Sequence, residues 1–182
     1  MSALPTHRLT VDEFMVWAAD QPGRFELYAG QVYAMAPERA GLAVVKFAVQ
    51  SELNRAIIAA RKSCHMLPDG MTVRVAADTA HEPDALVYCG PKVPPNTVEI
   101  GNPVIVVEVL SPSTRHIDAS AKLAGYFQLP SVQHYLIVDP EHLPVLHHNR
   151  QSNGTILTRI VPSGEIVLDP PGIVLDVQNF FN

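Results

Sequence analysis

The sequence predicts an α/β protein with a mixed central β-sheet flanked by helices and a C-terminal β-meander. Apolar residues recur at helical spacing in one long segment, and short runs rich in β-branched residues follow it. A run of strands precedes one further helix and strand, whereas a doubly wound parallel fold needs a more regular alternation. The 182 residues are expected to form a single domain, residues 1–182.

The N-terminal part of the chain carries two local signals. Thr10 with Glu13 three residues later is a capping-box signature, so a helix is expected over residues 11–19. Next comes "RFELYAGQVYAMAP", in which two β-rich runs flank Ala29-Gly30. Such a pattern predicts a β-hairpin with its turn at the glycine.

The longest helix is expected from Gly41 to Lys62. Its basic last turn, Arg61 and Lys62, suits the negative end of the helix dipole. The predicted apolar stripe comprises Val45, Ala48, Val49, Leu53, Ile57 and Ile58. Three strands are expected after it, "GMTVRVA", "DALVYCG" and "PVIVVEVL", then a helix in "HIDASAKLAGYFQL" and a buried strand in "QHYLIVDP". The remainder alternates short strands with turns and predicts a peripheral meander.

Composition and charge narrow the class of protein. With 47% hydrophobic and 17% charged residues the chain is an ordinary globular sequence. The formal net charge of −5 argues against a non-specific DNA coat protein, although a local basic patch is compatible with it. No apolar run approaches the ~18 residues of a membrane helix, and the first residues lack a signal-peptide core. A cytoplasmic protein is therefore expected.

The two cysteines, Cys64 and Cys89, are far apart and neither belongs to a Cys-x-x-Cys pair. Neither a structural zinc site nor a disulfide is expected from this spacing, and a reducing compartment fits it. Cys89 is expected to be a small buried apolar residue. Three histidines near the end of the sequence match no common metal-site spacing and are expected at an exposed strand tip: His142, His147 and His148.

Two carboxylates interrupt apolar runs in the middle of the chain. Glu108 lies within "PVIVVEVL", and Asp84 begins the run "DALVYCG". An ionised carboxylate loses several kcal/mol of solvation on burial unless a charged group meets it. If the two strands are antiparallel neighbours, Asp84 and Glu108 approach at one edge of the sheet, where they repel each other unless a cation lies between them. Hard oxygen ligands of this kind suit Mg²⁺ or Mn²⁺.

A third acid and a base extend this candidate site. Glu26 interrupts the apolar residues of "FELY", and Lys122 lies in the helix that follows Glu108, on the same side as Asp118. A lysine beside a metal-bound phosphate stabilises the charge that develops on the phosphoryl oxygens or orients the attacking water.

In the order and spacing of these residues the chain resembles the Uma-type family of putative restriction endonucleases, which is placed in the PD-(D/E)XK nuclease superfamily. The likeness runs from about residue 8 to residue 150. It rests on Glu26-Leu27 with Gly30, Pro83-Asp84, the stretch from Glu108 to Thr114, Asp118 with Lys122-Leu123 and Tyr126, and Tyr135 with Val138-Asp139-Pro140.

The resemblance implies a restriction-endonuclease-like core and Mg²⁺-dependent hydrolysis of DNA phosphodiester bonds. It makes Asp84 the aspartate of the "PD" element and Glu108 the acid of the "(D/E)XK" element, and it matches Glu26 to the acid of the first core element. The backbone carbonyl of Val109 is a further expected metal ligand. A homodimer is plausible on this view, because two related sites cut both strands of a duplex most easily.

Three departures from the family pattern support a rival interpretation. Leu110 stands where the superfamily lysine is expected, although Lys122 is placed to replace it from the next helix. Gln31 stands where a second acid often follows the hairpin glycine, and "ERAGLAVV" lacks a histidine near the start of the long helix. The rival is a catalytically inactive nuclease-like binding or assembly module.

Each of these candidate site residues also has a structural interpretation that needs no catalysis. Asp84 can cap a strand edge, and Glu108 can form an ion pair with Lys122 or Arg115. Glu26 can be a solvated or cross-strand partner, and most helical lysines are surface charges. Loss of activity on replacing Asp84 or Glu108 separates the enzyme from the binding module.

Overall fold

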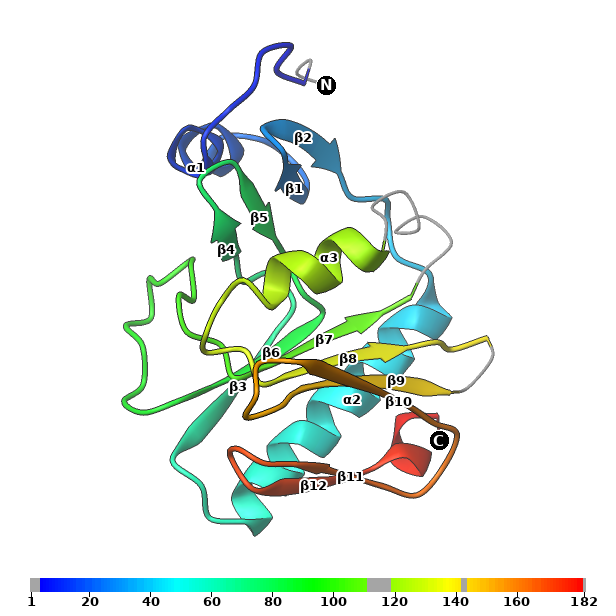
Figure 1. Ribbon diagram of the computed structural model, residues 1–182. Coiled ribbons are helices and arrows are strands. Elements are labelled where there is room, and N and C mark those ends of the chain that lie inside the picture. The colour runs from blue at the N-terminus through cyan, green and yellow to red at the C-terminus, as the bar shows by residue number, and fades with distance from the viewer. Residues whose placement is uncertain (1–3, 111–118, 142–143, 182) are drawn as a thin grey trace.

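The structure is a computed structural model of the chain and describes residues 4–110, 119–141 and 144–181. Its centre is a six-stranded sheet in the order β10-β9-β8-β7-β6-β3 (Figure 1). The neighbours β7 and β8 are parallel, and the other neighbouring pairs are antiparallel. The sheet is therefore mixed, as predicted. The strands span Cys64–Pro68 (β3), Ala85–Cys89 (β6), Ile105–Val109 (β7), His134–Val138 (β8), Val145–Arg150 (β9) and Ile156–Val161 (β10).

The central strands are buried on both faces because both faces are covered. Side chains alternate along a strand, so Val107 and Val106 of β7 point to opposite sides. Val107 packs in one cluster with Leu53 of helix α2 (Ala40–Ala59), whereas Val106 packs in another with Tyr126 of helix α3 (Ala119–Tyr126). This two-sided cover explains why the strand sequences read as continuous apolar runs.

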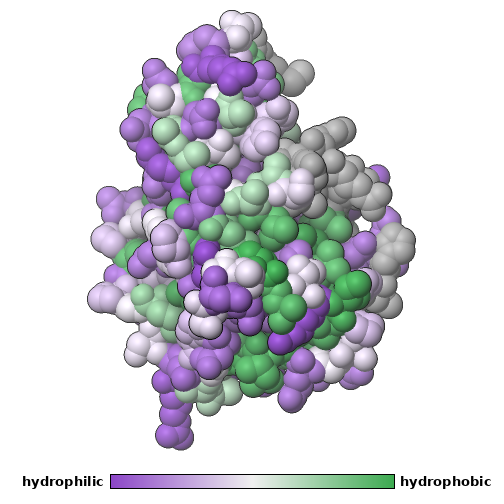
Figure 2. Space-filling view, in the orientation of Figure 1, coloured by the Kyte–Doolittle hydropathy of each residue, from purple (hydrophilic) through white to green (hydrophobic). Residues whose placement is uncertain are grey.

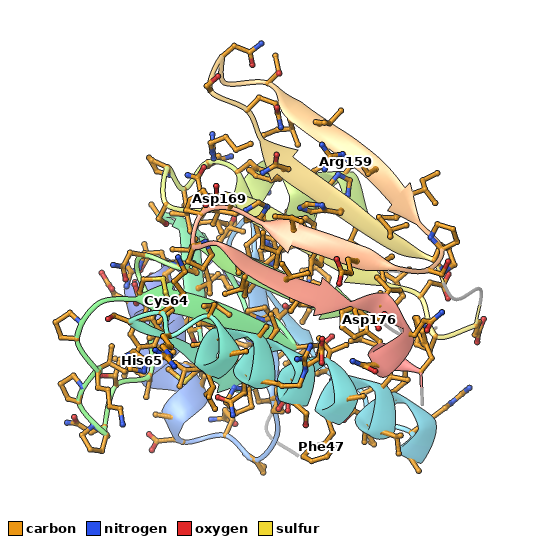
Figure 3. All side chains as sticks on the ribbon, turned by 90° about the horizontal axis from the view of Figure 1, so that it is seen from below. Phe47, Cys64, His65, Arg159, Asp169 and Asp176 are labelled. Atoms are coloured by element: carbon orange, nitrogen blue, oxygen red, sulfur yellow. A yellow bond between two sulfur atoms is a disulfide. The ribbon has the colours of Figure 1, made fainter. Side chains whose placement is uncertain are left out.

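The C-terminal residues complete the α2 side of the molecule. The hairpin β11 (Glu165–Leu168) and β12 (Ile173–Asp176) and the 3₁₀-helix η2 (Val177–Phe180) contribute to the same apolar cluster as α2. Figure 3 shows the hairpin lying alongside α2. The expected C-terminal meander is thus divided, because β9 and β10 extend the main sheet and only β11 and β12 form a separate two-stranded sheet.

A second sheet, ordered β2-β1-β5-β4, carries the N-terminal part of the fold. It comprises β1 (Phe25–Tyr28), β2 (Gln31–Ala34), β4 (Val73–Ala76) and β5 (Thr79–His81), with helix α1 (Val11–Ala19) packed against it. The predicted helix 11–19 is confirmed with both capping-box hydrogen bonds. The predicted hairpin is confirmed too, and its turn places Ala29 and Gly30 at positive φ, 48° and 78°.

The long helix α2 is shorter than predicted. It ends at Ala59, and Arg61 has a φ of +51°, outside the helical region. The basic pair therefore does not form a last helical turn. Ile58, which the stripe placed in the core, is 67% exposed. Ile58 lies within α2 but on its exposed face, so helical spacing alone assigned it wrongly to the core.

The predicted state of the cysteines is wrong. Strands β3 and β6 pair in a register that places Cys64 directly opposite Cys89, and the two form a disulfide with Cα atoms 3.9 Å apart. The sequence separation of 25 residues concealed this, because β3 itself was not predicted. Cys89 is half-buried rather than a core residue.

The predicted exposure of the histidines is also wrong for the two that the structure describes. His147 and His148 belong to β9, an interior strand of the main sheet, and both are buried. The Nε2 of His147 lies 2.9 Å from Nδ1 of His134, whose Nε2 lies 2.9 Å from the Pro170 carbonyl. Burial lowers the pKa of His134 and of His147 to about 4, so the pair is neutral at pH 7. His142 lies outside the described residues.

The outer edge of the main sheet presents apolar side chains. Figure 2 shows hydrophobic residues gathered over the β8 to β10 region of this face. Ile160 and Leu157 of the edge strand β10 contribute to the exposed apolar surface. In the described part of the chain no helix is long and apolar enough to span a membrane.

Glu52 joins α2 to the C-terminal segment, and Glu52→Ala is expected to lower the free energy of unfolding by about 2–4 kcal/mol. Its buried carboxylate accepts hydrogen bonds from the Asp176 backbone N–H (2.9 Å) and the Asn179 side chain (3.1 Å). Alanine leaves these donors unpaired. The hydrogen bond from Arg55 lowers the pKa of Glu52, so its contribution is present above the ordinary glutamate pKa and is lost as the pH falls.

Urea unfolding followed by circular dichroism measures this loss. Glu165→Ala is the control, because Glu165 is an exposed acid of the neighbouring hairpin. It is expected to change the free energy of unfolding by less than about 0.5 kcal/mol. Equal small losses in both variants would show that Glu52 does not anchor the C-terminal segment.

Candidate active site

Asp84 and Glu108 are neighbours at the end of the main sheet where β6 begins and the adjacent strand β7 ends. Strand β6 pairs antiparallel with β7 so that Ala85 lies opposite Val107, and the Asp84 N–H donates to the Val107 carbonyl at 3.0 Å. The Oδ2 atom of Asp84 in turn accepts from the Val109 N–H at 2.6 Å. The pairing thus brings the start of one strand beside the end of the other, which is the arrangement that the sequence predicted.

Glu108 is buried and is held by two donors. Its Oε1 accepts a hydrogen bond from the Tyr126 hydroxyl at 2.7 Å and one from Lys122 Nζ at 2.9 Å. Burial raises the pKa of Glu108 to about 7, and although the Lys122 ammonium opposes this shift, the nearby charges of Asp84 and Glu26 add to it. Glu108 therefore changes protonation state near neutral pH.

Lys122 bridges Glu108 to the second sheet. Its Nζ also donates to Oε1 of Glu26 in β1 at 2.9 Å, and the same oxygen accepts from the Glu82 N–H at 2.9 Å. Burial on its own lowers the pKa of Lys122, but the two carboxylates outweigh it and raise the pKa above the ordinary lysine value. The predicted residues Glu26, Glu108 and Lys122 thus form one buried network.

Lys46 of α2 contacts Oδ1 of Asp84, the carboxylate oxygen that the Val109 N–H does not contact. Its Nζ lies 2.6 Å from Asp84 Oδ1, it pairs with Glu38, and it lies 3.8 Å from Asp69 Oδ2. Burial raises the pKa of Asp84, and the charge of Lys46 opposes that shift. The sequence grouped Lys46 only with scattered basic residues of the helix. Its isolation within the apolar run "AVVKFAV" was the available signal.

His81 is a further residue that the sequence did not indicate. It is 1% exposed, and neither ring nitrogen has a hydrogen-bond partner among the described residues. Its Nδ1 lies 3.9 Å from Glu26 Oε1, and its ring packs edge-on against Tyr126. Burial lowers the pKa of His81 to about 4, so the ring is neutral at pH 7. His81 therefore supplies no charge to the network.

A pocket of about 510 Å³ opens onto these side chains. Asp84, Glu108 and Lys122 line its floor together with Lys46 and the end of β7. The loop between β2 and α2, residues 35–39, forms another part of the wall. Gln31, which departs from the family pattern in the sequence analysis, is exposed on β2 and does not line this pocket. Asp118, Arg115 and residues 111–114 lie outside the described part of the chain.

The donor set at the pocket fits a hard divalent cation. Within residues 4–110, 119–141 and 144–181, no group of three His, Cys, Asp or Glu side chains could hold a metal ion, so a site here needs a backbone ligand. The Val109 N–H faces Asp84, and the N–H and C=O of one residue point to the same side of an extended strand. The Val109 carbonyl is therefore expected on the β6 side of its strand, which is the side of Asp84. These three oxygen donors suit Mg²⁺ or Mn²⁺ with open positions for water and substrate.

Comparison with known proteins places the chain in a family. A family model described as "Uma2: Putative restriction endonuclease" matches residues 11–178. The chain belongs to the Uma2 family. The resemblance seen in the sequence is thereby confirmed, and it extends to the C-terminal hairpin that the motifs did not reach.

Two relatives of this Uma2 protein cover nearly its whole length. "Uncharacterized protein slr1290" of Synechocystis sp. (strain ATCC 27184 / PCC 6803 / Kazusa) is 26% identical over 187 residues, which cover 96% of this chain and 92% of that protein. A crystal structure titled as a putative nuclease belonging to DUF820, from Anabaena variabilis ATCC 29413, matches with a TM-score of 0.72. That match covers 95% of this chain and 97% of the other at 15% identity, so it shows the fold. The nuclease-like α/β fold is confirmed.

Proposed function

We propose that this Uma2 protein is a metal-dependent deoxyribonuclease that hydrolyses DNA phosphodiester bonds. The observation that carries the proposal is the convergence of Asp84, Glu108 and Lys122 on one pocket. Two adjacent carboxylates with a lysine are a suitable set for binding a divalent cation and an anionic phosphate together. Membership of a family described as putative restriction endonucleases supports the same reaction class.

Each residue of the network has a role in this proposal. Asp84, Glu108 and the Val109 carbonyl would hold Mg²⁺ or Mn²⁺, which when bound acidifies a water molecule and neutralises charge on the phosphate. The Lys122 ammonium lies beside Glu108 and faces the pocket, where it attracts a phosphate oxygen or orients the attacking water. Glu26 and Tyr126 position Lys122 and Glu108 through the hydrogen bonds described above. A homodimer would place two such sites on one duplex.

Purified protein incubated with supercoiled, linear duplex and single-stranded DNA tests the proposal. We expect cleavage of at least one substrate in Mg²⁺ or Mn²⁺, and its loss in EDTA. Because burial raises the pKa of Glu108 to about 7, the rate should fall as the pH drops below 7, where the protonated carboxyl no longer binds a cation. A rate that is independent of both metal and pH would contradict the proposal.

One observation favours the alternative, a nuclease-like binding or assembly module. Asp84 already pairs with Lys46, and Glu108 already pairs with Lys122. A module of this kind needs no metal, so it would retain partner affinity in Asp84→Asn and Glu108→Gln and would cleave no substrate. Cleavage that requires both carboxylates excludes this alternative.

A further inference from the structure

We propose that the open edge of β3 is a docking groove for an extended, acidic segment of a partner protein, which would bind as an additional strand of the main sheet. A groove of about 580 Å³ lies at this edge. Among the described residues, it shares no lining residue with the pocket of the candidate active site. The inference is therefore independent of the proposed DNA hydrolysis.

The groove lies across the edge of the main sheet. In the part of the chain that the structure describes, the edge strand β3 pairs only with β6. Cys64 of β3 packs in the cluster on the α2 side, whereas the ring of His65 packs on Tyr88, a member of the cluster on the other face. Both Cys64 and His65 line the groove, and they lie beside the C-terminal part of α2 (Figure 3). A hollow that is lined from both faces of a strand runs along the open edge of that strand.

The backbone of β3 provides hydrogen-bonding groups for an added strand. The Ser63 carbonyl accepts from the Gly90 N–H at 2.8 Å, so the polar backbone groups of Ser63 face the β6 side. Along an antiparallel strand, residues that bond to the neighbour alternate with residues whose N–H and C=O point away from it. Cys64 and Met66 are therefore directed to the open edge. Such a row of N–H and C=O groups is a template for another strand.

Apolar side chains form the walls of the groove. Ile58 of α2, which is 67% exposed, lies on one side, and Val93 and Pro94 of the loop after β6 lie on the other. The Val93 N–H donates to the Tyr88 hydroxyl at 3.1 Å, which holds this loop against the sheet. Side chains of an added strand point alternately to the two sides of the sheet, so they would contact both walls.

The charges of the groove favour an acidic occupant. Arg61, Lys62 and Lys92 line it and are exposed, and no aspartate or glutamate is among the described residues that line it. This basic lining stands against a formal net charge of −5 for the whole chain. Carboxylates of an added strand would pair with the three cations, whereas a basic segment would be repelled.

Two other occupants match the groove less well. The second edge strand of the main sheet, β10, carries Arg159 as its single charged residue, so strand pairing with a second copy would bring a further cation to the basic groove. A DNA duplex offers phosphates to the three cations, but it leaves the backbone edge of β3 and the apolar walls without matching groups.

Selection of a phage-displayed library of random decapeptides on the purified full chain tests the inference. We expect the selected sequences to alternate apolar residues with aspartate or glutamate. Synthetic peptides of these sequences should bind the triple variant Arg61→Gln, Lys62→Gln and Lys92→Gln about tenfold more weakly than the wild type in fluorescence anisotropy. Arg159→Gln is the control, because Arg159 is an exposed cation outside the groove, and it should bind with wild-type affinity.

Met66→Pro tests the strand pairing itself. An edge strand accommodates proline where the missing N–H faces outward, but the added strand then loses a donor. We expect Met66→Pro to abolish peptide binding, whereas Met66→Ala, which keeps the N–H, should weaken it less. If Met66→Pro folds poorly, hydrogen exchange of the wild type provides the readout. The Cys64 and Met66 amides should then exchange more slowly with bound peptide than without it.

Several results would overturn the inference. Selection that yields no binder, or binders without acidic residues, would do so, as would selected peptides that bind the triple variant as tightly as the wild type. Duplex DNA binding that the triple variant loses, without peptide binding, would assign the groove to nucleic acid instead. Self-association in sedimentation velocity that the triple variant abolishes would assign it to a second copy of the chain.

Discussion

Replacing Glu108 with glutamine is expected to lower the rate of metal-dependent DNA cleavage by on the order of 10³-fold. The two side chains have nearly the same shape, and an amide oxygen still accepts the hydrogen bonds from Lys122 and Tyr126. The change therefore removes mainly the negative charge. A neutral amide is a weak ligand for Mg²⁺, so the cation is bound weakly and its effect on water and phosphate is lost.

Glu52→Gln provides a matched control for this experiment. Glu52 is also a buried glutamate, but it contacts the C-terminal segment and does not line the pocket. Its glutamine variant should cleave DNA at the wild-type rate when both proteins are folded at the assay temperature. Single-turnover rates in Mg²⁺ and in Mn²⁺ make the comparison. Cleavage by Glu108→Gln within tenfold of the wild type would show that the reaction occurs elsewhere.

The candidate-site residues that could be predicted from the sequence are charged side chains that lie within or beside runs of apolar residues. Glu108 and Asp84 stood out because each interrupts or begins a run of apolar residues, and the antiparallel pairing of β6 and β7 then placed them together. Glu26 could be found by the same conflict in a short strand. The assignment of Asp84 and Glu108 to metal binding rested on the chemistry of adjacent carboxylates and on the family resemblance, and it stays a prediction.

Lys46 and His81 were not predictable as members of the site, because their roles depend on long-range packing. A lysine in a helix is usually solvated, and only the tertiary structure shows that α2 directs Lys46 onto Asp84. His81 lies in a three-residue strand whose existence depends on pairing with β1 and β4. For Lys46 the only local signal is its isolation within an apolar run, and for His81 the sequence contains none.

In the fold, too, the elements with local sequence signals were predicted and those that depend on long-range pairing were not. Helix α1 was predicted with correct bounds and the first hairpin with its turn in the correct place, because a capping box and a turn glycine are local signals. Strand β3 was missed because "CHMLP" is neither alternating nor strongly β-branched, and the disulfide between Cys64 and Cys89 was missed with it. Its stability as a strand comes from pairing with β6, which no local pattern reports.

Lys122→Met is expected to lower the free energy of unfolding by about 3–5 kcal/mol at pH 8. The ammonium of Lys122 lies 2.9 Å from Glu26 and 2.9 Å from Glu108, and all three side chains are buried. Methionine preserves the apolar stem but leaves two carboxylates without a counter-ion. The cost is large because water cannot solvate the carboxylates in place of the lysine.

The pH dependence of this loss identifies its electrostatic origin. Glu108 and Glu26 raise the pKa of Lys122 above its ordinary value, so the stabilisation by Lys122 is fully present below that ordinary value and is lost only as the pH rises through the shifted one. In Lys122→Met, Glu108, whose pKa burial raises to about 7, can instead become neutral by taking up a proton. The variant should therefore be closest to the wild type near pH 5 and progressively less stable toward pH 8.

Urea unfolding of both proteins at pH 5, 6.5 and 8 measures this trend. Lys92→Met serves as the control, because Lys92 is exposed and its removal should change the free energy of unfolding by less than about 0.5 kcal/mol at each pH. A loss in Lys122→Met that is the same at every pH would indicate altered packing rather than an unpaired charge. A loss below about 1 kcal/mol at pH 8 would show that Lys122 is not the counter-ion of the buried carboxylates.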